Sequence, residues 1–178
     1  VHVCKPFEIP EDWPRDMAID FGVRNPFAAI WFAHDEDKDC LYVYREYYKT
    51  EKTTLENGRM IKALSARDPA LRWIVADPES KDGRLLLSRE LQLHTKKAPK
   101  HLGVVETINL VKERLALNAE GQPALVIFSS CKQLLKEFRL YKWAKSAGAD
   151  KPHKQHDHGL DALRYECSFL YRFRKHRG

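Results

Sequence analysis

The sequence lacks long apolar runs and is poor in the residues that break regular structure. No stretch approaches the roughly 18 uncharged apolar residues of a membrane helix. The chain of 178 residues has only 8 Gly and 9 Pro, while 43% of its residues are hydrophobic and 31% are charged. This composition excludes collagen-like, low-complexity and disordered classes, and it is sufficient for one domain with a buried core.

Several diagnostic motifs are also missing from the sequence. Cys4, Cys40, Cys131 and Cys167 lie far apart with no CxxC pair, so we expect reduced cysteines in an intracellular protein. There is no GxxxxGK[ST], GxGxxG or GxSxG motif, which argues against ATP hydrolysis and dinucleotide binding by this chain alone. The first residue is Val1 and no charged-then-apolar leader follows. We therefore expect no signal peptide, and a chain excised from something longer.

Basic residues are in moderate excess and are unevenly distributed. The formal net charge is +6, which is compatible with a polyanionic partner without establishing one. An acidic segment spans residues 34–39, whereas residues 132–154 and the C-terminal tail are strongly basic. A solvated helix face and a frayed terminus would explain either basic segment alone, but two of them around carboxylates favour phosphate binding. The candidate DNA contacts are Lys142, Lys145, Lys154, Arg172 and Arg174.

The apolar pattern predicts strands followed by alternating helices and strands. Residues 1–15 contain three prolines and indicate an extended lead-in or linker. Strands are expected at 17–22, 27–33, 40–48, 71–76 and 124–128, with a short one near 93, and the first three as antiparallel neighbours. Helices are expected at 55–64, 80–91, 101–117, 130–141 and 156–173, with a polar loop at 143–155. This order predicts a single-domain α/β layer fold with a mixed sheet flanked by helices.

Three aspartates lie in apolar surroundings at the ends of predicted elements. Asp20 lies within MAIDFG, Asp77 closes LRWIVA, and Asp161 lies near the start of the last helix, with Asp157 one turn earlier. A lone aspartate at such a place is more often a turn former, and Asp157 could be a helix N-cap. A carboxylate within a buried strand is harder to dismiss, because it needs a cation, hydrogen bonds or a metal.

If these carboxylates converge, their repulsion requires a compensating divalent ion. Oxygen ligands favour Mg²⁺ or Mn²⁺. Two such ions, about 3.5–4 Å apart, can activate a water and stabilise the leaving oxygen in phosphodiester hydrolysis. Asp20 is the best candidate for sharing both ions, with Asp77 and Asp161 completing one site each.

A histidine-based zinc site is the rival interpretation. His153, His156 and His158 lie in the tract HKQHDH, but a structural zinc site normally shows two ordered ligand pairs and there is only one tract here. His158 could still serve beside the carboxylates as a ligand, a phosphate contact or a proton carrier. It could equally be a surface histidine.

Four segments together resemble the C-terminal nuclease domain of the large terminase subunit, the DNA-packaging motor of tailed bacteriophages. They are MAIDFGVRNPFAAI, IVADPES, LVIFSSCKQLLKEFRLYKW and KQHDHGLDALRY. The resemblance covers about residues 17–165, and DHGLDALRY is its most specific element. It implies an RNase H-like (retroviral-integrase-like) fold and a metal-dependent endonuclease that cuts concatemeric viral DNA at the start and end of packaging.

The resemblance also assigns roles to individual residues. The acidic triad falls on Asp20, Asp77 and Asp161, with Asp157 and His158 as accessory metal or active-site residues. Lys100 matches a family lysine that could contact phosphate or the carboxylates.

The family's N-terminal ATPase domain is missing here, so Val1 to Arg15 is expected to be the end of an interdomain linker and residues 16–178 the nuclease domain. The implied partners are double-stranded DNA, that ATPase domain, the portal ring and the small terminase subunit. The implied location is the host cytoplasm at the assembling capsid, and not the mature virion.

Two other functions remain open from the sequence. In a non-catalytic module, the basic surface would bind DNA or dock on a portal ring and the acids would be structural. A junction resolvase or transposase core would share the carboxylate chemistry, although the LDALRY ending and the CKQLLKEFRLYKW helix argue against it.

Overall fold

The computed structural model describes residues 1–22, 26–146 and 157–176. These residues form a seven-stranded mixed sheet with the strand order β1-β7-β4-β3-β2-β5-β6. The strands are β1 (Val3–Cys4), β2 (Arg15–Asp20), β3 (Phe27–Asp35), β4 (Cys40–Lys49), β5 (Leu71–Ala76), β6 (Lys96–Lys97) and β7 (Leu125–Phe128). The helices are α1 (Thr54–Ser65), α2 (Lys81–Leu91), α3 (Val104–Leu115), α4 (Lys132–Ser146) and α5 (His158–Lys175).

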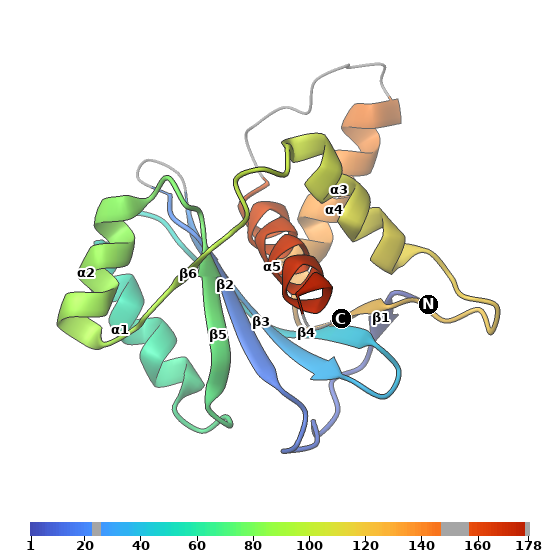
Figure 1. The fold of residues 1–178 in the computed structure, drawn as a ribbon, viewed down its shortest axis with the longest axis horizontal. Coiled ribbons are helices and arrows are strands. Elements are labelled where there is room, and N and C mark those ends of the chain that lie inside the picture. Colours follow the sequence, from blue (N-terminus) through green and yellow to red (C-terminus); the bar gives the residue numbers. More distant parts are fainter. Residues whose placement is uncertain (23–25, 147–156, 177–178) are drawn as a thin grey trace.

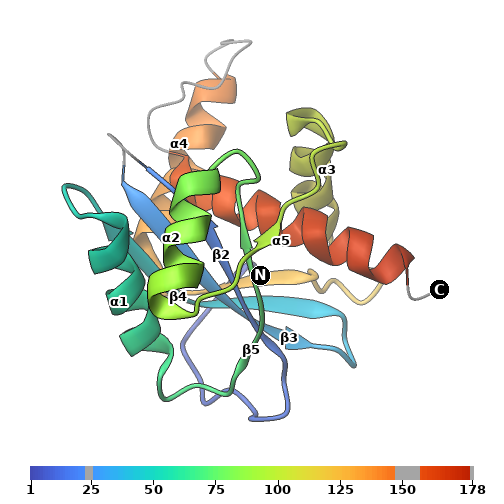
Figure 2. The ribbon, with the colours of Figure 1, turned by 60° about the vertical axis from the view of Figure 1, so that its left-hand side comes forward.

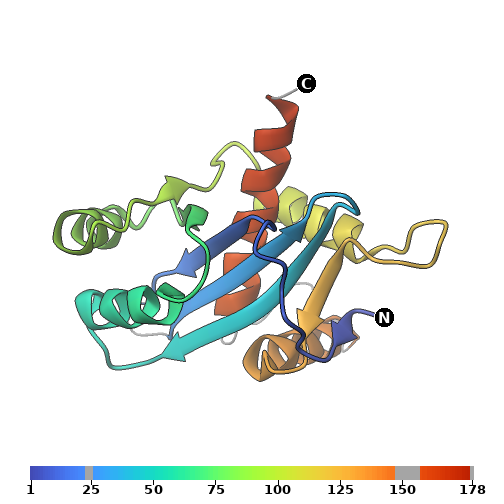
Figure 3. The ribbon, with the colours of Figure 1, turned by 90° about the horizontal axis from the view of Figure 1, so that it is seen from below.

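The centre of the sheet is the antiparallel meander expected from the sequence. β2 pairs with β3 and β3 with β4, both antiparallel, and the three strands lie side by side in Figure 3. β5 runs parallel to β2, and β6 runs parallel to β5. On the other side, β7 runs parallel to β4, and β1 to β7. Because β2 and β5 are parallel neighbours, their carboxyl ends meet at the same end of the sheet.

Helices cover both faces of the sheet. Figure 1 shows α1 and α2 on one side and α3, α4 and α5 on the other, and in Figure 2 α5 crosses the sheet as one long helix. Successive residues of β2 therefore enter different cores. Met17 packs with Ile61 and Leu87 under α1 and α2, whereas Ala18 packs in the core that contains Leu163 of α5. Burial on both faces explains why β2 and β3 are buried throughout.

Several predicted boundaries are confirmed and others shift for identifiable reasons. α1 begins at Thr54, after the N-cap Thr53, which forms a complete capping box with Glu56, and β5 has the expected bounds. α2 ends at Leu91, and its C-cap Gln92 has a left-handed φ of 56°. The chain therefore turns back before it pairs with β5, and the short strand forms at Lys96–Lys97 instead of near residue 93. α4 continues to Ser146, beyond the expected end.

The lead-in before β2 packs against the sheet. β1 adds a parallel edge strand to β7, and the ring of Trp13 stacks on Tyr42 of β4 with 5.3 Å between ring centroids. Arg15 is already the first residue of β2 and is buried. The assignment of residues 1–15 to an interdomain linker stays a prediction. Within the described residues, no helix is both long enough and apolar enough to span a membrane.

Candidate active site

Two of the predicted aspartates lie next to each other at one end of the sheet. Asp20 is the last residue of β2 and is 8% exposed. In the parallel pairing of β2 with β5, Ile19 is opposite Ala76, so Asp20 and Asp77 follow neighbouring positions. The Asp77 carboxylate accepts a hydrogen bond from the Glu79 backbone N–H at 2.9 Å, which holds the turn that leads into α2.

The start of α5 brings further site residues to the same place. Asp157 occupies the N-cap position, but its side chain makes no capping hydrogen bond. Nδ1 of His158, which is 8% exposed, lies 2.8 Å from Oδ2 of Asp20. That pairing raises the pKa of His158. Nε2 of His158 is buried and has no hydrogen-bond partner among the described residues. A polar nitrogen is thus left available beside the carboxylates.

Asp161 lies one turn into α5 and is held by an arginine that we did not single out. Arg164 donates from Nε and Nη2 to Oδ1 of Asp161, at 3.1 and 2.5 Å. Its Nη1 donates to Oγ1 of Thr107 in α3 at 2.8 Å. The spacing of three residues between Asp161 and Arg164 was a usable signal, because such residues share a helix face.

The electrostatics show that the three aspartates share one environment. Burial raises the pKa of Tyr165, and the carboxylates of Asp20, Asp161 and Asp77 raise it further. Burial also raises the pKa of Asp161 to about 6 against the opposing effect of Arg164, and the charges of Asp20 and Asp157 add smaller contributions to the rise. Negative charge is therefore in excess at this end of the sheet.

This donor set fits a divalent cation in its chemistry. Carboxylate oxygens are suitable ligands for Mg²⁺ or Mn²⁺, and a cation would offset the charges of Asp20 and Asp157 that add to the raised pKa of Asp161. Within the described residues, no three of these side chains are already gathered around a single point. Asp20 is paired with His158, and Asp161 with Arg164.

Glu137 of α4 supports the start of α5, and sequence reasoning missed it. It is 2% exposed, and its Oε2 accepts a hydrogen bond from the Leu160 N–H at 3.0 Å. Its carboxylate thus satisfies a backbone donor in the first turn of α5. A Cβ at the adjacent Gly159 would lie 1.7 Å from the Tyr48 hydroxyl oxygen, so this close approach requires glycine. In the sequence Glu137 looks like any polar residue of a helix, and no local signal marks it.

Glu137 makes stability depend on pH. Burial raises the pKa of this carboxyl to about 7, although the Leu160 N–H opposes the rise. A raised pKa penalises the folded state as pH increases from about 4.5, where the unfolded chain ionises, to 7. We expect Glu137→Gln to remove this loss and to be more stable than wild type at pH 8, by up to roughly 3 kcal/mol. Urea unfolding at pH 4.5 and pH 8 measures the difference in free energy of unfolding between the variant and wild type. The same difference at both pH values would contradict the assigned role of Glu137.

The predicted basic contacts are scattered. Nζ of Lys100 lies 2.6 Å from Oε1 of Glu79, and both side chains are exposed. Glu79 is two residues after Asp77 in the sequence. Arg172 is exposed in the last turn of α5. Arg174 pairs with Asp39 in the β3–β4 turn and lies 3.1 Å from Nε2 of His34. Arg174 is about 20 Å along the helix from Asp161, and its charge is already balanced by a carboxylate.

The remaining predicted DNA contacts cannot be placed by their side chains. Lys142 and Lys145 belong to α4, but their side chains lie outside the described part of the chain, as does the whole of Lys154. His153 and His156 of the rival zinc interpretation also lie outside it. DNA binding by these lysines stays a prediction.

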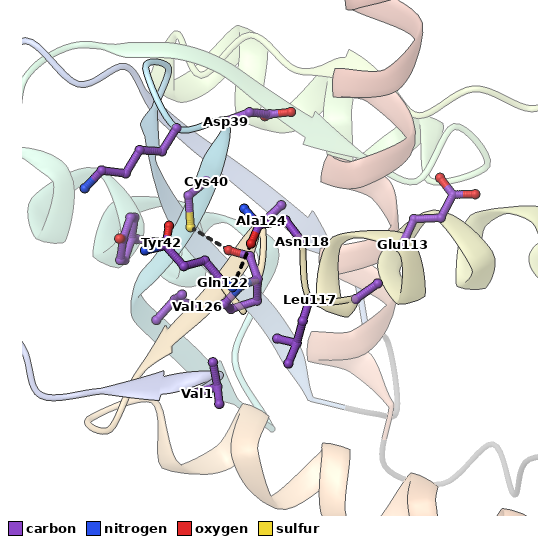
Figure 4. Close-up of a pocket in the computed structure, with 13 residues that line it drawn as sticks. Val1, Asp39, Cys40, Tyr42, Glu113, Leu117, Asn118, Gln122, Ala124 and Val126 are labelled. Carbon is purple, nitrogen blue, oxygen red and sulfur yellow. Dashed lines mark hydrogen bonds between the residues drawn. The ribbon is translucent and has the colours of Figure 1, made fainter. Parts of the chain in front are cut away.

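A separate cavity of about 540 Å³ lies at the opposite end of the sheet, where β4 begins (Figure 4). Asp39, Cys40 and Asn118 are among its lining residues. The Cys40 thiol donates to the Pro123 carbonyl at 3.5 Å, and burial raises its pKa to about 11. A thiol with such a pKa is not a nucleophile at neutral pH. Because it lies at the opposite end of the sheet, the cavity is not part of the aspartate site.

Comparison with known proteins points to one family. The family model described as "Terminase RNaseH-like domain" matches residues 17–168. The large terminase subunit of Escherichia phage T5 is 28% identical over 165 residues, which are 89% of this chain and 36% of that protein. The chain spans about a third of the length of the curated relatives it matches.

Solved structures agree with the family match. The nuclease domain of the phage P22 large terminase has a TM-score of 0.72 at 23% identity, covering 95% of this chain and 87% of that one. The large terminase nuclease domain of bacteriophage SPP1, solved with bound Mn, has a TM-score of 0.67 at 16% identity, covering 96% of both chains. The expected RNase H-like fold, a mixed sheet flanked by helices, is thereby confirmed.

Proposed function

Because the chain belongs to the family of terminase RNaseH-like domains, we propose that it is a metal-dependent endonuclease for double-stranded DNA. Its substrate in the cell is concatemeric viral DNA, which it cuts when genome packaging begins and when it ends. The observation that carries the proposal is that Asp20 and Asp77 follow neighbouring positions of β2 and β5, and that the charges of both and of Asp161 act on Tyr165. They come from two neighbouring strands and the helix that crosses them.

The aspartates supply the ligands for the metal ions. Asp20 is placed centrally and would share both ions, while Asp77 and Asp161 would each complete one site, with Asp157 at the rim. When bound, two divalent ions activate a water and stabilise the leaving oxygen of a phosphodiester. Mg²⁺ and Mn²⁺ are both candidates, and the Mn bound to the SPP1 nuclease domain supports including Mn²⁺.

The side chains around the aspartates orient them. His158 holds Oδ2 of Asp20 through a 2.8 Å hydrogen bond, and its raised pKa favours the protonated imidazole. Arg164 fixes Asp161 and is itself anchored on Thr107. Glu137 fixes the backbone at the start of α5. These contacts hold the carboxylates in place before substrate arrives, as an efficient site requires.

The wider setting follows from the relatives, each of which is about three times as long as this chain. We place this domain behind an ATPase domain of the same polypeptide, with the portal ring and the small terminase subunit as partners. It would act in the host cytoplasm at the assembling capsid and would not remain in the mature virion.

Supercoiled plasmid tests the function. The purified chain should nick and linearise plasmid in Mg²⁺ or Mn²⁺ and should stop when EDTA is added, because water activation at the aspartates needs the ions. Agarose gels over a time course measure both products. Cutting that survives EDTA would point to a contaminant or another mechanism. A folded protein that binds plasmid but never cuts it would favour the docking module.

A further inference from the structure

A basic groove lies along the free edge of the sheet, between α2 and the segment that leads into β6. Its volume is about 370 Å³, and it is lined by Lys81, Arg84, Leu85, Ser88, His94 and Thr95. The lining contains two cations, a histidine and two hydroxyl groups, and no carboxylate. In Figure 1 the segment that leads from α2 into β6 rises from the lower end of α2 toward the end of the sheet where β2 and β5 finish.

The groove and the aspartates are connected by the fold. β6 pairs with β5 so that Lys97 is opposite Ala76, the residue before Asp77. α2 begins at Lys81, four residues after Asp77. The lining of the groove therefore begins near the aspartate end of the sheet. From Lys81 to Ser88 the lining helix is about 10 Å long, which matches about three nucleotide steps of one DNA strand.

Arg84 is held in the groove like a fixed anion receptor. Its Nε donates to Oγ1 of Thr95 at 2.9 Å and its Nη2 donates to the Thr95 carbonyl at 3.3 Å. Neither bond uses Nη1, and Arg84 is only partly exposed. Because these hydrogen bonds already restrict the guanidinium, it loses little further conformational freedom when it binds phosphate.

The charge around the groove exceeds its local needs. Residues 79–101 contain six Lys or Arg and three Asp or Glu, so they supply +3 of the net charge of +6. Lys96 and Lys97 are exposed and have no ion pair among the described residues. Lysines on an edge strand also discourage pairing with another sheet. That role does not explain Lys81 and Arg84, which belong to α2.

From this arrangement we propose that the α2–β6 groove binds the phosphate backbone of duplex DNA as it leaves the aspartate site. The inference rests on the proposed function and places the DNA path along this edge of the sheet, instead of along the C-terminal end of α5. Arg84 and Lys81 contact successive phosphates, and Lys96 and Lys97 extend the contact on the other wall.

Salt-dependent binding tests the groove without any cleavage. We would measure the affinity of the chain for a fluorescent 20-base-pair duplex in EDTA at several NaCl concentrations. The triple variant Lys81→Gln, Lys96→Gln, Lys97→Gln should bind at least tenfold more weakly at low salt. The slope of log affinity against log salt should become shallower by about 2 to 3, because each neutralised phosphate contributes about 0.9.

Arg84→Lys is a second variant that keeps the charge. It should weaken binding several-fold with little change in slope, because a lysine cannot reproduce the braced guanidinium. The matched control, Lys5→Gln, Lys38→Gln, Lys112→Gln, removes three exposed lysines elsewhere and should retain the wild-type slope. Lys142→Gln with Lys145→Gln tests the alternative path along α4.

The outcomes separate the groove from the proposed function. The groove proposal would be overturned by an unchanged salt slope in the groove variant or by an equal loss of DNA affinity in the control. A loss of affinity in the α4 variant alone would also overturn it. Plasmid cutting in Mn²⁺ is scored on the same proteins. If wild type fails to cut but the groove variant still loses binding, the nuclease proposal fails and the groove stands.

Discussion

Asp20→Asn should lower the rate of metal-dependent DNA cutting by about 10³-fold or more. The substitution removes the charge from the most central of the three carboxylates and keeps its shape. Metal stabilisation of the transition state is worth several kcal/mol, and each 1.36 kcal/mol is a tenfold change in rate. The initial rate of plasmid nicking at saturating Mn²⁺ measures the effect.

The same variant should fold and bind DNA normally in EDTA. Asn can still accept a hydrogen bond at Oδ1, so the contact with His158 is retained, and the basic groove is untouched. Asp37→Asn, an exposed position in the β3–β4 turn, is the matched control and should cut like wild type. Full activity in Asp20→Asn would remove Asp20 from the site.

Arg72→Met should lower the free energy of unfolding by about 3–5 kcal/mol at pH 7, because it strands a buried carboxylate. Asp16 is fully buried in β2, and Arg72 donates to both of its oxygens, from Nε at 2.9 Å and from Nη2 at 2.6 Å. The guanidinium also lies 3.9 Å from the ring centroid of Trp73. Within the described part of the chain, no other cation forms an ion pair with Asp16.

A second buried carboxyl makes this effect depend on pH. Trp73 donates from Nε1 to both oxygens of Glu166 at 3.2 Å. Burial raises the pKa of Glu166, and the neighbouring charge of Asp16 raises it further. Arg72 opposes this rise, so the charged form of Glu166 becomes less favourable in the folded state when Arg72 is lost. The loss of stability should therefore be smaller at pH 4.5 and should grow as pH rises.

Urea unfolding followed by circular dichroism measures the Arg72→Met effect. Asp16→Asn combined with Arg72→Met should recover part of the loss, since no charge remains to be buried. Arg59→Met removes an exposed arginine from α1 and should change stability by less than about 0.5 kcal/mol. If Arg72→Met and Arg59→Met were equally mild, the buried pair would not be a stabilising element.

Much of the aspartate site follows from the sequence because it depends on local rules. Asp20 and Asp77 each end a short apolar strand, and parallel neighbouring strands end together. Asp161 lies one turn after Asp157, and Arg164 one turn after Asp161. The antiparallel meander and the capped α1 likewise depend on residues that are close together in the chain.

The supporting residues could not be found in this way because their partners are distant in sequence. Glu137 contacts a backbone group 23 positions away, and Arg174 meets Asp39 across 135 positions. The tail therefore looked like a free basic surface, although one of its arginines is held by the acidic turn. The α2–β6 groove was also missed, since it depends on where α2 ends and on how two residues of β6 pair with β5.

Whether Asp20, Asp77 and Asp161 form one metal site is tested most directly by calorimetric titration with Mn²⁺. Wild type and Asp37→Asn should bind the ion with the same stoichiometry. Asp20→Asn should lose most of the binding, and Asp77→Asn and Asp161→Asn should each lose part of it, because all three carboxylates contribute ligands. Mn²⁺ binding that is identical in wild type and all three site variants would contradict a shared metal site at the end of β2 and β5.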